Sequence, residues 1–139
     1  MQPDALRAAD TRAWLEKAVL DLRSARADLG ASPPIRGDAL FHCQQAVEKS
    51  LNAWLTWHDR PFRKTHDLGE LGTHGAALDA SLEPLLREAA PLTEYAWQFR
   101  YPGDVAEPTA DESTAGLDVA ERVVAAVADR LPPEARPTP

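Results

Sequence analysis

Basic and imidazole side chains concentrate in one short stretch of an acidic chain, residues 58–66, with the sequence HDRPFRKTH. The whole chain carries 15 Lys and Arg against 22 Asp and Glu. Arg63, Lys64 and His66 come just before Asp67, which has an acid three residues later, a pattern typical of a helix start. Because a helix N-terminus offers free N–H groups and the positive end of a dipole, the stretch predicts a phosphate site. The structural alternative is that Asp67 only caps, His66 bonds a carbonyl, and the cations are solvated.

Two polar residues interrupt the apolar face of a predicted helix in FHCQQAVEKSL. At 100° per residue, Gln44 falls between Leu51 and Leu55 in the middle of the apolar stripe, and Glu48 lies at its edge. A buried amide or carboxylate is costly unless it is hydrogen-bonded. The two residues therefore either make an interhelical hydrogen bond or a dimer contact, or line a functional groove with the basic stretch.

Arg100 and Tyr101 start a later loop, RYPGDVAEP, and are the other binding candidates. They would add a guanidinium and a stacking ring to the site if that loop lies beside residues 58–66. We therefore expect these two segments to meet in a shared cleft.

Other chemistries find little support in the sequence. Cys43 is the only cysteine, and none of the four histidines has zinc-finger spacing. The chain contains no HExxH, GxxxxGK or GxSxG string. We predict no metal site and no cofactor.

The length of 139 residues suits one domain. The first residues do not read as a secretory signal, and no stretch approaches the 18 or more apolar residues of a membrane span. We expect a soluble, cytoplasmic protein without membrane contact. The net charge of −7 disfavours a general nucleic-acid coat but allows a local basic site.

Helical periodicity runs through nearly the whole chain. It predicts a helix over residues 12–29, a second of about 20 residues that Asp38 caps and Pro61 closes, and a third over residues 68–78. Ser81 is the expected cap of a fourth helix that reaches Phe99.

Pro91 should kink that fourth helix near residue 90. Thr109 and Glu112 form a capping box for the last helix. We predict an all-α antiparallel four-helix up-and-down bundle with one additional short helix, as a single domain over residues 1–131. Residues 132–139 should be a disordered tail.

Three motifs together resemble the HEPN domain family: the QQAVEK segment of the second helix, THDL before the third, and RYP after a helix that ends in aromatics. The resemblance covers residues 10–131. It implies a five-helix bundle that is commonly dimeric, with a name that refers to nucleotide binding. It also implies a partner, because such chains are often encoded beside a minimal nucleotidyltransferase as a toxin–antitoxin pair.

Many members of the wider superfamily are metal-independent ribonucleases with an Arg followed, after four to six residues, by a His. This chain departs from that pattern, because Val105, Ala106 and Glu107 occupy the corresponding positions after Arg100. Arg60 and His66 have the right spacing but the wrong place in the fold. The missing histidine favours a nucleotide- or nucleic-acid-binding module that partners a nucleotidyltransferase, without catalysis of its own. The alternative is a ribonuclease toxin with an atypical site that uses His66 or Arg100.

Two tryptophans project away from the main apolar stripes of their helices, Trp57 and Trp97. Large side chains at such flanks commonly anchor interfaces, and packing under a loop is the ordinary alternative. We expect a homodimer or a contact with a nucleotidyltransferase there.

Overall fold

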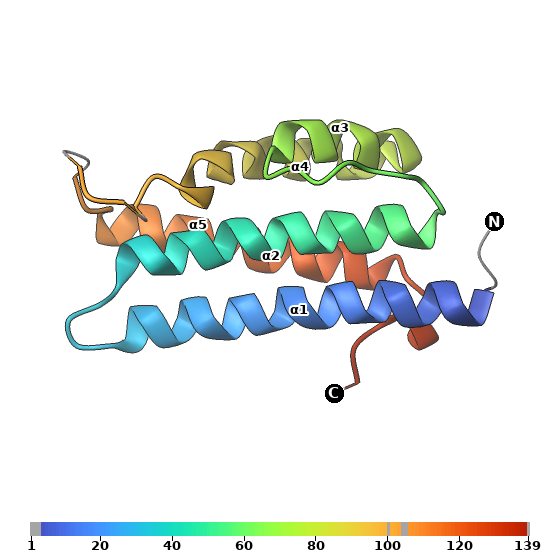
Figure 1. Ribbon diagram of the computed structural model, residues 1–139, viewed down its shortest axis with the longest axis horizontal. Helices are drawn as coiled ribbons and strands as arrows, with labels where there is room; N and C mark the ends of the chain where they lie inside the picture. Colours follow the sequence, from blue (N-terminus) through green and yellow to red (C-terminus); the bar gives the residue numbers. More distant parts are fainter. Residues whose placement is uncertain (1–3, 100, 104–105, 139) are drawn as a thin grey trace.

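The computed structural model describes residues 4–99, 101–103 and 106–138, and within these ranges it contains helices and no β-strand. The α-helices, in chain order, are α1 (Asp4–Gly30), α2 (Arg36–Trp57), α3 (Leu68–Leu78), α4 (Glu83–Ala89) and α5 (Ala110–Asp129). The 3-10 helices are η1 (Ala80–Leu82), η2 (Ala90–Ala96) and η3 (Pro133–Ala135). α1 and α2 form a long antiparallel hairpin, and α5 runs beside α2 (Figure 1). α3 and α4 lie over α2 and α5. The predicted all-α bundle is confirmed.

The buried residues of α1 follow a seven-residue repeat. The two rows of this repeat are Ala8, Leu15 and Leu22, and Thr11, Ala18 and Ala25. A seven-residue spacing keeps one seam of a helix facing its neighbour, and here the neighbour is α2. The repeat reaches back to Ala8, so α1 begins two turns earlier than the predicted residue 12.

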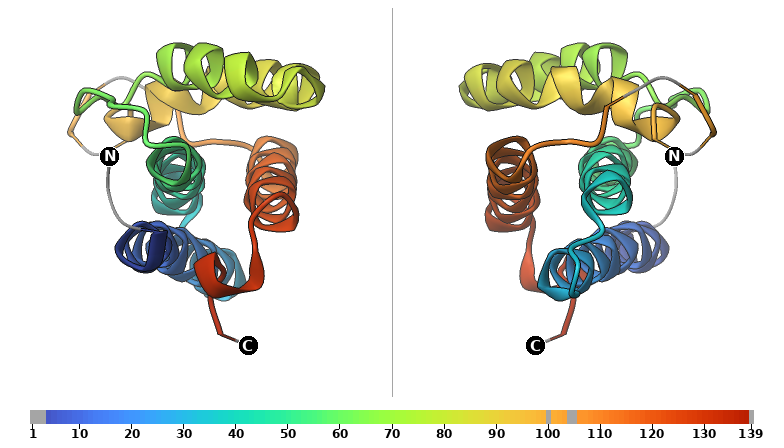
Figure 2. Two further views of the ribbon diagram at one scale, coloured as in Figure 1. Left: turned by 90° about the vertical axis from the view of Figure 1, so that its right-hand side faces the viewer. Right: turned by 90° about the vertical axis from the view of Figure 1, so that its left-hand side faces the viewer.

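α2 is the central helix of the bundle. Buried side chains cover most of its circumference, from Ala39 and Leu40 to Trp54 and Leu55. Figure 2 shows the reason: α2 lies between α1 and the α3–α4 layer, with α5 at its side. α5 approaches closely at Gly116, where an added Cβ would come within 2.4 Å of the Leu40 Cδ2 atom.

The predicted cap of α2 is wrong. The helix begins at Arg36, two residues before Asp38, and Ile35 occupies the cap position without a side-chain hydrogen bond. The turn before the helix sets its start, because the Ile35 N–H donates to the Asp28 carbonyl oxygen of α1 at 2.9 Å. The Asp38 carboxylate is left to interact with His42, one turn further along.

The fourth predicted helix is divided into three parts. Asp79, not Ser81, caps it, since the Asp79 side chain accepts from the Ser81 N–H at 3.0 Å. The α-helical part ends at Ala89, and the chain continues as η2 through Pro91. Proline has no N–H to donate to the carbonyl four residues earlier, which accounts for the change of helix type at the predicted kink.

The other two predicted caps are confirmed. Asp67 caps α3, and Thr109 forms a reciprocal capping box with Glu112 at the start of α5.

The C-terminal segment differs from the expected disordered tail. It forms η3, whose Ala135 is fully buried. The Arg12 guanidinium of α1 donates to the Glu134 carbonyl oxygen at 2.7 Å, and Arg136 donates to the Leu131 carbonyl oxygen at 2.8 Å. These contacts hold the C-terminal segment against α1.

None of the helices described has both the length and the apolar composition that a membrane span requires.

Candidate functional site

The connector, residues 58–67, leaves the end of α2 and runs back along the bundle to the start of α3 (Figure 1). Together with α1 and α2 it encloses a cavity of about 400 Å³, hereafter the connector cavity. Its lining residues are Trp14 from α1, Glu48 and Asn52 from α2, and Phe62, Arg63, Lys64, Thr65 and His66 from the connector. A cavity of this size falls in the range that small ligands occupy.

Gln44 and Glu48 hold the end of the connector in place. Gln44 is fully buried, as predicted, and its amide donates to the His66 carbonyl oxygen at 3.0 Å and to the Glu48 carboxylate at 3.2 Å. The same Glu48 oxygen lies 2.6 Å from Nδ1 of His66. The hydrogen bonds of Gln44 therefore go to the connector and to its own helix and not to another helix, and Glu48 lines the connector cavity beside the basic stretch.

The apolar side of the connector cavity is aromatic. The rings of Trp14 and Phe62 pack edge to face, with centroids 6.2 Å apart and planes 67° apart. Both side chains are half-buried. Aromatic faces of this kind are the surfaces on which nucleobases stack.

Asn52 is a lining residue that sequence reasoning missed. Only 6% of its surface is exposed, and its side-chain amide has no hydrogen-bond partner in the described part of the chain. Asn52 lines the connector cavity, so its donors and acceptor are available to a ligand there.

The two cations of the connector have different surroundings. Arg63 Nε lies 2.9 Å from both carboxylate oxygens of Glu70, which ties the connector to α3. Lys64 is exposed and has no ion-pair partner among the residues described. Lys64 is therefore the cation with charge left for a ligand.

The N-terminus of α3 is already satisfied, which differs from the predicted phosphate site. The Asp67 carboxylate accepts from the N–H groups of Gly69 and Glu70 at 2.9 and 3.2 Å. The Leu68 N–H donates to the Thr93 hydroxyl at 3.0 Å. Asp67 therefore acts as a cap, and any phosphate recognition falls to the connector side chains.

A second, more open cavity of about 550 Å³ lies on the other side of His66. It is lined by connector residues, by the start of α3 and by Ala90, Thr93 and Trp97. Trp97 is 51% exposed. Trp57, the last residue of α2, is half-buried, and the Arg7 guanidinium lies 4.9 Å from the centroid of the Trp57 ring. The Arg7 contact accounts for Trp57, whereas Trp97 stays exposed.

Of the two residues expected beside the connector, Arg100 and Tyr101, the structure describes only Tyr101. Arg100 lies outside the described residues, and Tyr101 is 74% exposed and does not appear among the described residues that line either cavity. Phe99 packs against Gly37 at the start of α2, where an added Cβ would lie 2.8 Å from the Phe99 Cβ. Gly37 precedes Gln44 by seven residues, or about 10 Å along the helix. The connector instead meets η2 and Trp97.

Two further sequence observations carry no chemistry in this geometry. Arg60 lines a different cavity from His66, with Leu55, Pro61 and His74, so their spacing does not make a pair. Burial raises the pKa of the Cys43 thiol to about 12, so this cysteine is not an available nucleophile.

Comparison with protein families matches the HEPN domain over residues 11–131. Comparisons with curated proteins and with solved structures gave no match. The family match includes α2, the connector and α5, and the all-helical architecture agrees with it. The chain belongs to the HEPN domain family.

Proposed function

We propose that this HEPN domain binds a nucleotide, or a single-stranded RNA nucleotide, in the connector cavity, and acts as an interaction module without catalysis of its own. The observation that carries the proposal is the lining of the cavity, where the amide of Asn52, which has no partner in the described part of the chain, lies with two aromatic rings and Lys64. A base needs a ring to stack on and a polar group at its edge, and a phosphate needs a cation. The cavity combines all three.

Each part of the cavity has a role in this proposal. Trp14 and Phe62 stack on the base, and Asn52 bonds to its edge, since an amide can donate and accept side by side as an adenine edge requires. Lys64 and Arg63 attract the phosphate. Arg63 is the weaker of the two, because Glu70 already balances its charge.

The partner in this proposal is a minimal nucleotidyltransferase, as in the toxin–antitoxin pairs that the family resemblance implies. The exposed Trp97 beside the second cavity supports an interface, because large exposed aromatic side chains commonly anchor protein contacts. A homodimer is the other assembly that this surface could serve. Co-expression with a neighbouring nucleotidyltransferase, followed by sizing with and without Trp97→Ala, distinguishes the two assemblies.

Calorimetric titration with ATP and with inorganic triphosphate tests the binding site. Lys64→Ala should weaken the binding of both ligands. The loss should be larger at low salt than at high salt, because exposed charges are screened over about 8 Å at physiological ionic strength. Asn52→Ala should weaken the binding of ATP by about tenfold and leave the binding of inorganic triphosphate unchanged, since only ATP has a base edge.

Arg23→Ala is the matched control, because it removes one exposed cation of α1 that lies outside the connector cavity. Equal losses in the Arg23 and Lys64 variants would mean that net charge, and not the cavity, governs binding. Absence of any binding by the wild-type protein would refute the proposal.

The second candidate function is an RNA-cleaving ribonuclease, and the Glu48–His66 pair favours it. A histidine oriented by a carboxylate, exposed at 59% and next to two cations, has the parts of a general base beside phosphate-binding groups. Growth of cells that express the protein alone tests it. Toxicity that disappears in His66→Ala or Arg100→Ala supports the enzyme, and harmless expression together with ATP binding supports the module.

A further inference from the structure

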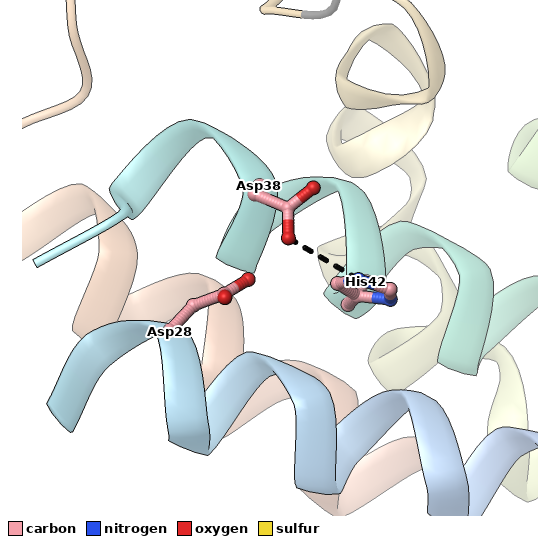
Figure 3. Close-up of side chains that lie close together, drawn as sticks. All are labelled: Asp28, Asp38 and His42. Carbon is pink, nitrogen blue, oxygen red and sulfur yellow. Dashed lines mark ion pairs between the residues drawn. The ribbon is translucent and has the colours of Figure 1, made fainter. Parts of the chain in front are cut away.

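Three potential metal ligands from two helices converge at the loop end of the α1–α2 hairpin (Figure 3). Asp28 lies in the last turns of α1, Asp38 in the first turn of α2, and His42 one turn further along α2. One ligand atom from each residue lies within 4.8 Å of the other two. The His42 Nε2 atom is 3.3 Å from Asp38 Oδ2.

His42 is held with Nε2 directed at this group. Its Nδ1 atom lies 2.8 Å from the buried carboxylate of Asp21, whose second oxygen accepts from Lys49 at 2.6 Å. An ionised carboxylate only accepts hydrogen bonds, so the proton of a neutral His42 ring belongs on Nδ1. The lone pair of Nε2 then faces Asp38. Metal-binding histidines are oriented in the same way, by a carboxylate on the nitrogen that does not bind the metal.

The carboxyl groups of Asp28 and Asp38 are crowded. The Asp28 Oδ2 atom is inaccessible to solvent and has no hydrogen-bond partner in the described part of the chain. A neutral His42 adds a third lone pair to the same small space. A cation among the three groups would satisfy all of them.

We propose that Asp28, Asp38 and His42 bind a divalent transition-metal ion, with Zn²⁺ as the best fit, and that the ion joins α1 to α2. Tetrahedral Zn²⁺ has bonds of about 2.0 to 2.2 Å, which place neighbouring ligand atoms about 3.3 Å apart, as His42 and Asp38 are. The Asp38 side chain is 52% exposed, so it can rotate to shorten the longer separations. Imidazole favours Zn²⁺ over Mg²⁺ or Ca²⁺, which prefer sites made of oxygen atoms.

The sequence could not reveal this site, because its ligands follow no zinc-finger spacing. Asp38 and His42 are four residues apart and share a face of α2. Asp28 joins them only because residues 31–35 turn the chain back, with the N–H groups of Ala31 and Ile35 both donating to the Asp28 carbonyl oxygen. With three protein ligands and an exposed rim at Asp38, the coordination sphere stays open to water.

Equilibrium dialysis of the full chain without an affinity tag, stripped with a chelator and then exposed to Zn²⁺ alone, tests the proposal. We expect one ion per chain, and a loss of affinity of about tenfold or more in Asp38→Asn, since even an outer partner of a metal ligand commonly contributes that much. Asp38 is the first choice because it is half-exposed and supports no core packing. Asp28→Asn should have the same effect, and circular dichroism verifies that both variants are folded.

Asp111→Asn is the matched control, because Asp111 is also an exposed aspartate in the first turn of a helix, α5. His66→Gln tests the competing histidine–carboxylate pair at Glu48. Zn²⁺ binding that survives Asp38→Asn and Asp28→Asn, or that disappears only in His66→Gln, would overturn the proposal. Mg²⁺ binding as tight as Zn²⁺ binding would overturn the choice of a transition metal. In NMR spectra of the wild-type protein, Zn²⁺ should shift Nε2 of His42 more than Nδ1.

Discussion

Glu48 lies 2.6 Å from the His66 ring and fixes its orientation at the border of two cavities. The same carboxylate oxygen also accepts from the buried Gln44 amide, so one acid of α2 organises both a core residue and a connector residue.

The Glu48–His66 pair should show measurable coupling. A double-mutant cycle of Glu48→Ala and His66→Ala in urea unfolding should give an interaction free energy of about 0.5 to 1 kcal/mol, a modest value because the histidine side chain is 59% exposed. Glu48→Gln is the control, because it keeps an acceptor for both partners. Additive effects of the two alanine substitutions would mean that the pair does not fix the ring.

Leu51 lies at the centre of the apolar stripe of α2 and is 1% exposed. Leu51→Ala should lower the free energy of unfolding by about 2 to 5 kcal/mol, because the packed surroundings cannot close the cavity completely. Chemical denaturation measures this change. Leu6→Ala, at a leucine of α1 that is 53% exposed, should change stability little in comparison. A loss below about 1 kcal/mol for Leu51→Ala would contradict the tight core around α2.

His58 should make the fold sensitive to mild acid. Burial, with Arg60 and Arg7 nearby, lowers the pKa of His58 from its ordinary 6.5, while Asp79 acts in the opposite direction. Because the folded pKa is the lower one, the unfolded state binds the proton more tightly. The contribution to stability is therefore complete above pH 6.5 and decreases as the pH falls below that value.

The variant His58→Phe tests this pH dependence. It keeps a ring against Trp54, whose centroid lies 4.3 Å from that of His58, and removes the titrating group. The urea midpoint of the variant should fall less steeply than that of the wild type between pH 7 and pH 5, as the linkage argument requires. Parallel pH profiles for the two proteins would rule out His58 as the source.

The C-terminal segment should contribute to stability. Deletion of residues 132–139 removes the buried Ala135 and the acceptor of the Arg12 hydrogen bond, so the free energy of unfolding should fall by about 1 to 3 kcal/mol. Deletion of residues 137–139 alone is the control, because it leaves these contacts in place. Equal stability of the two truncated chains would show that η3 adds nothing.

Periodicity and capping patterns were enough to predict the bundle. The spacing of Leu40, Val47 and Leu51 identified α2, and Asp67, Thr109 and Glu112 marked the starts of α3 and α5 correctly. The cap at Asp38 was wrong because the helix starts two residues earlier, at a turn in which the Ile35 N–H donates to the Asp28 carbonyl oxygen of α1. This contact joins residues from two elements and leaves no trace in the local sequence.

The candidate site was predictable only as a set of residue types. Gln44 and Glu48 were found because polar residues on an apolar stripe are conspicuous. Asn52 was missed because its significance depends on lacking a partner, which only coordinates can show. Trp14 was also missed as a lining residue, because its place in the cavity depends on how the connector crosses α1 and α2.

Gln44 recognises the main chain of residue 66 and not its side chain, since the bond goes to the carbonyl oxygen. Any amino acid at position 66 can offer that oxygen, whereas few can replace the amide at position 44. Over evolutionary time the fold therefore constrains the glutamine and leaves the identity of residue 66 open. Relatives that nevertheless keep histidine there would be retaining it for its ring, and a survey of natural variation at these two positions would separate scaffold from function without any experiment.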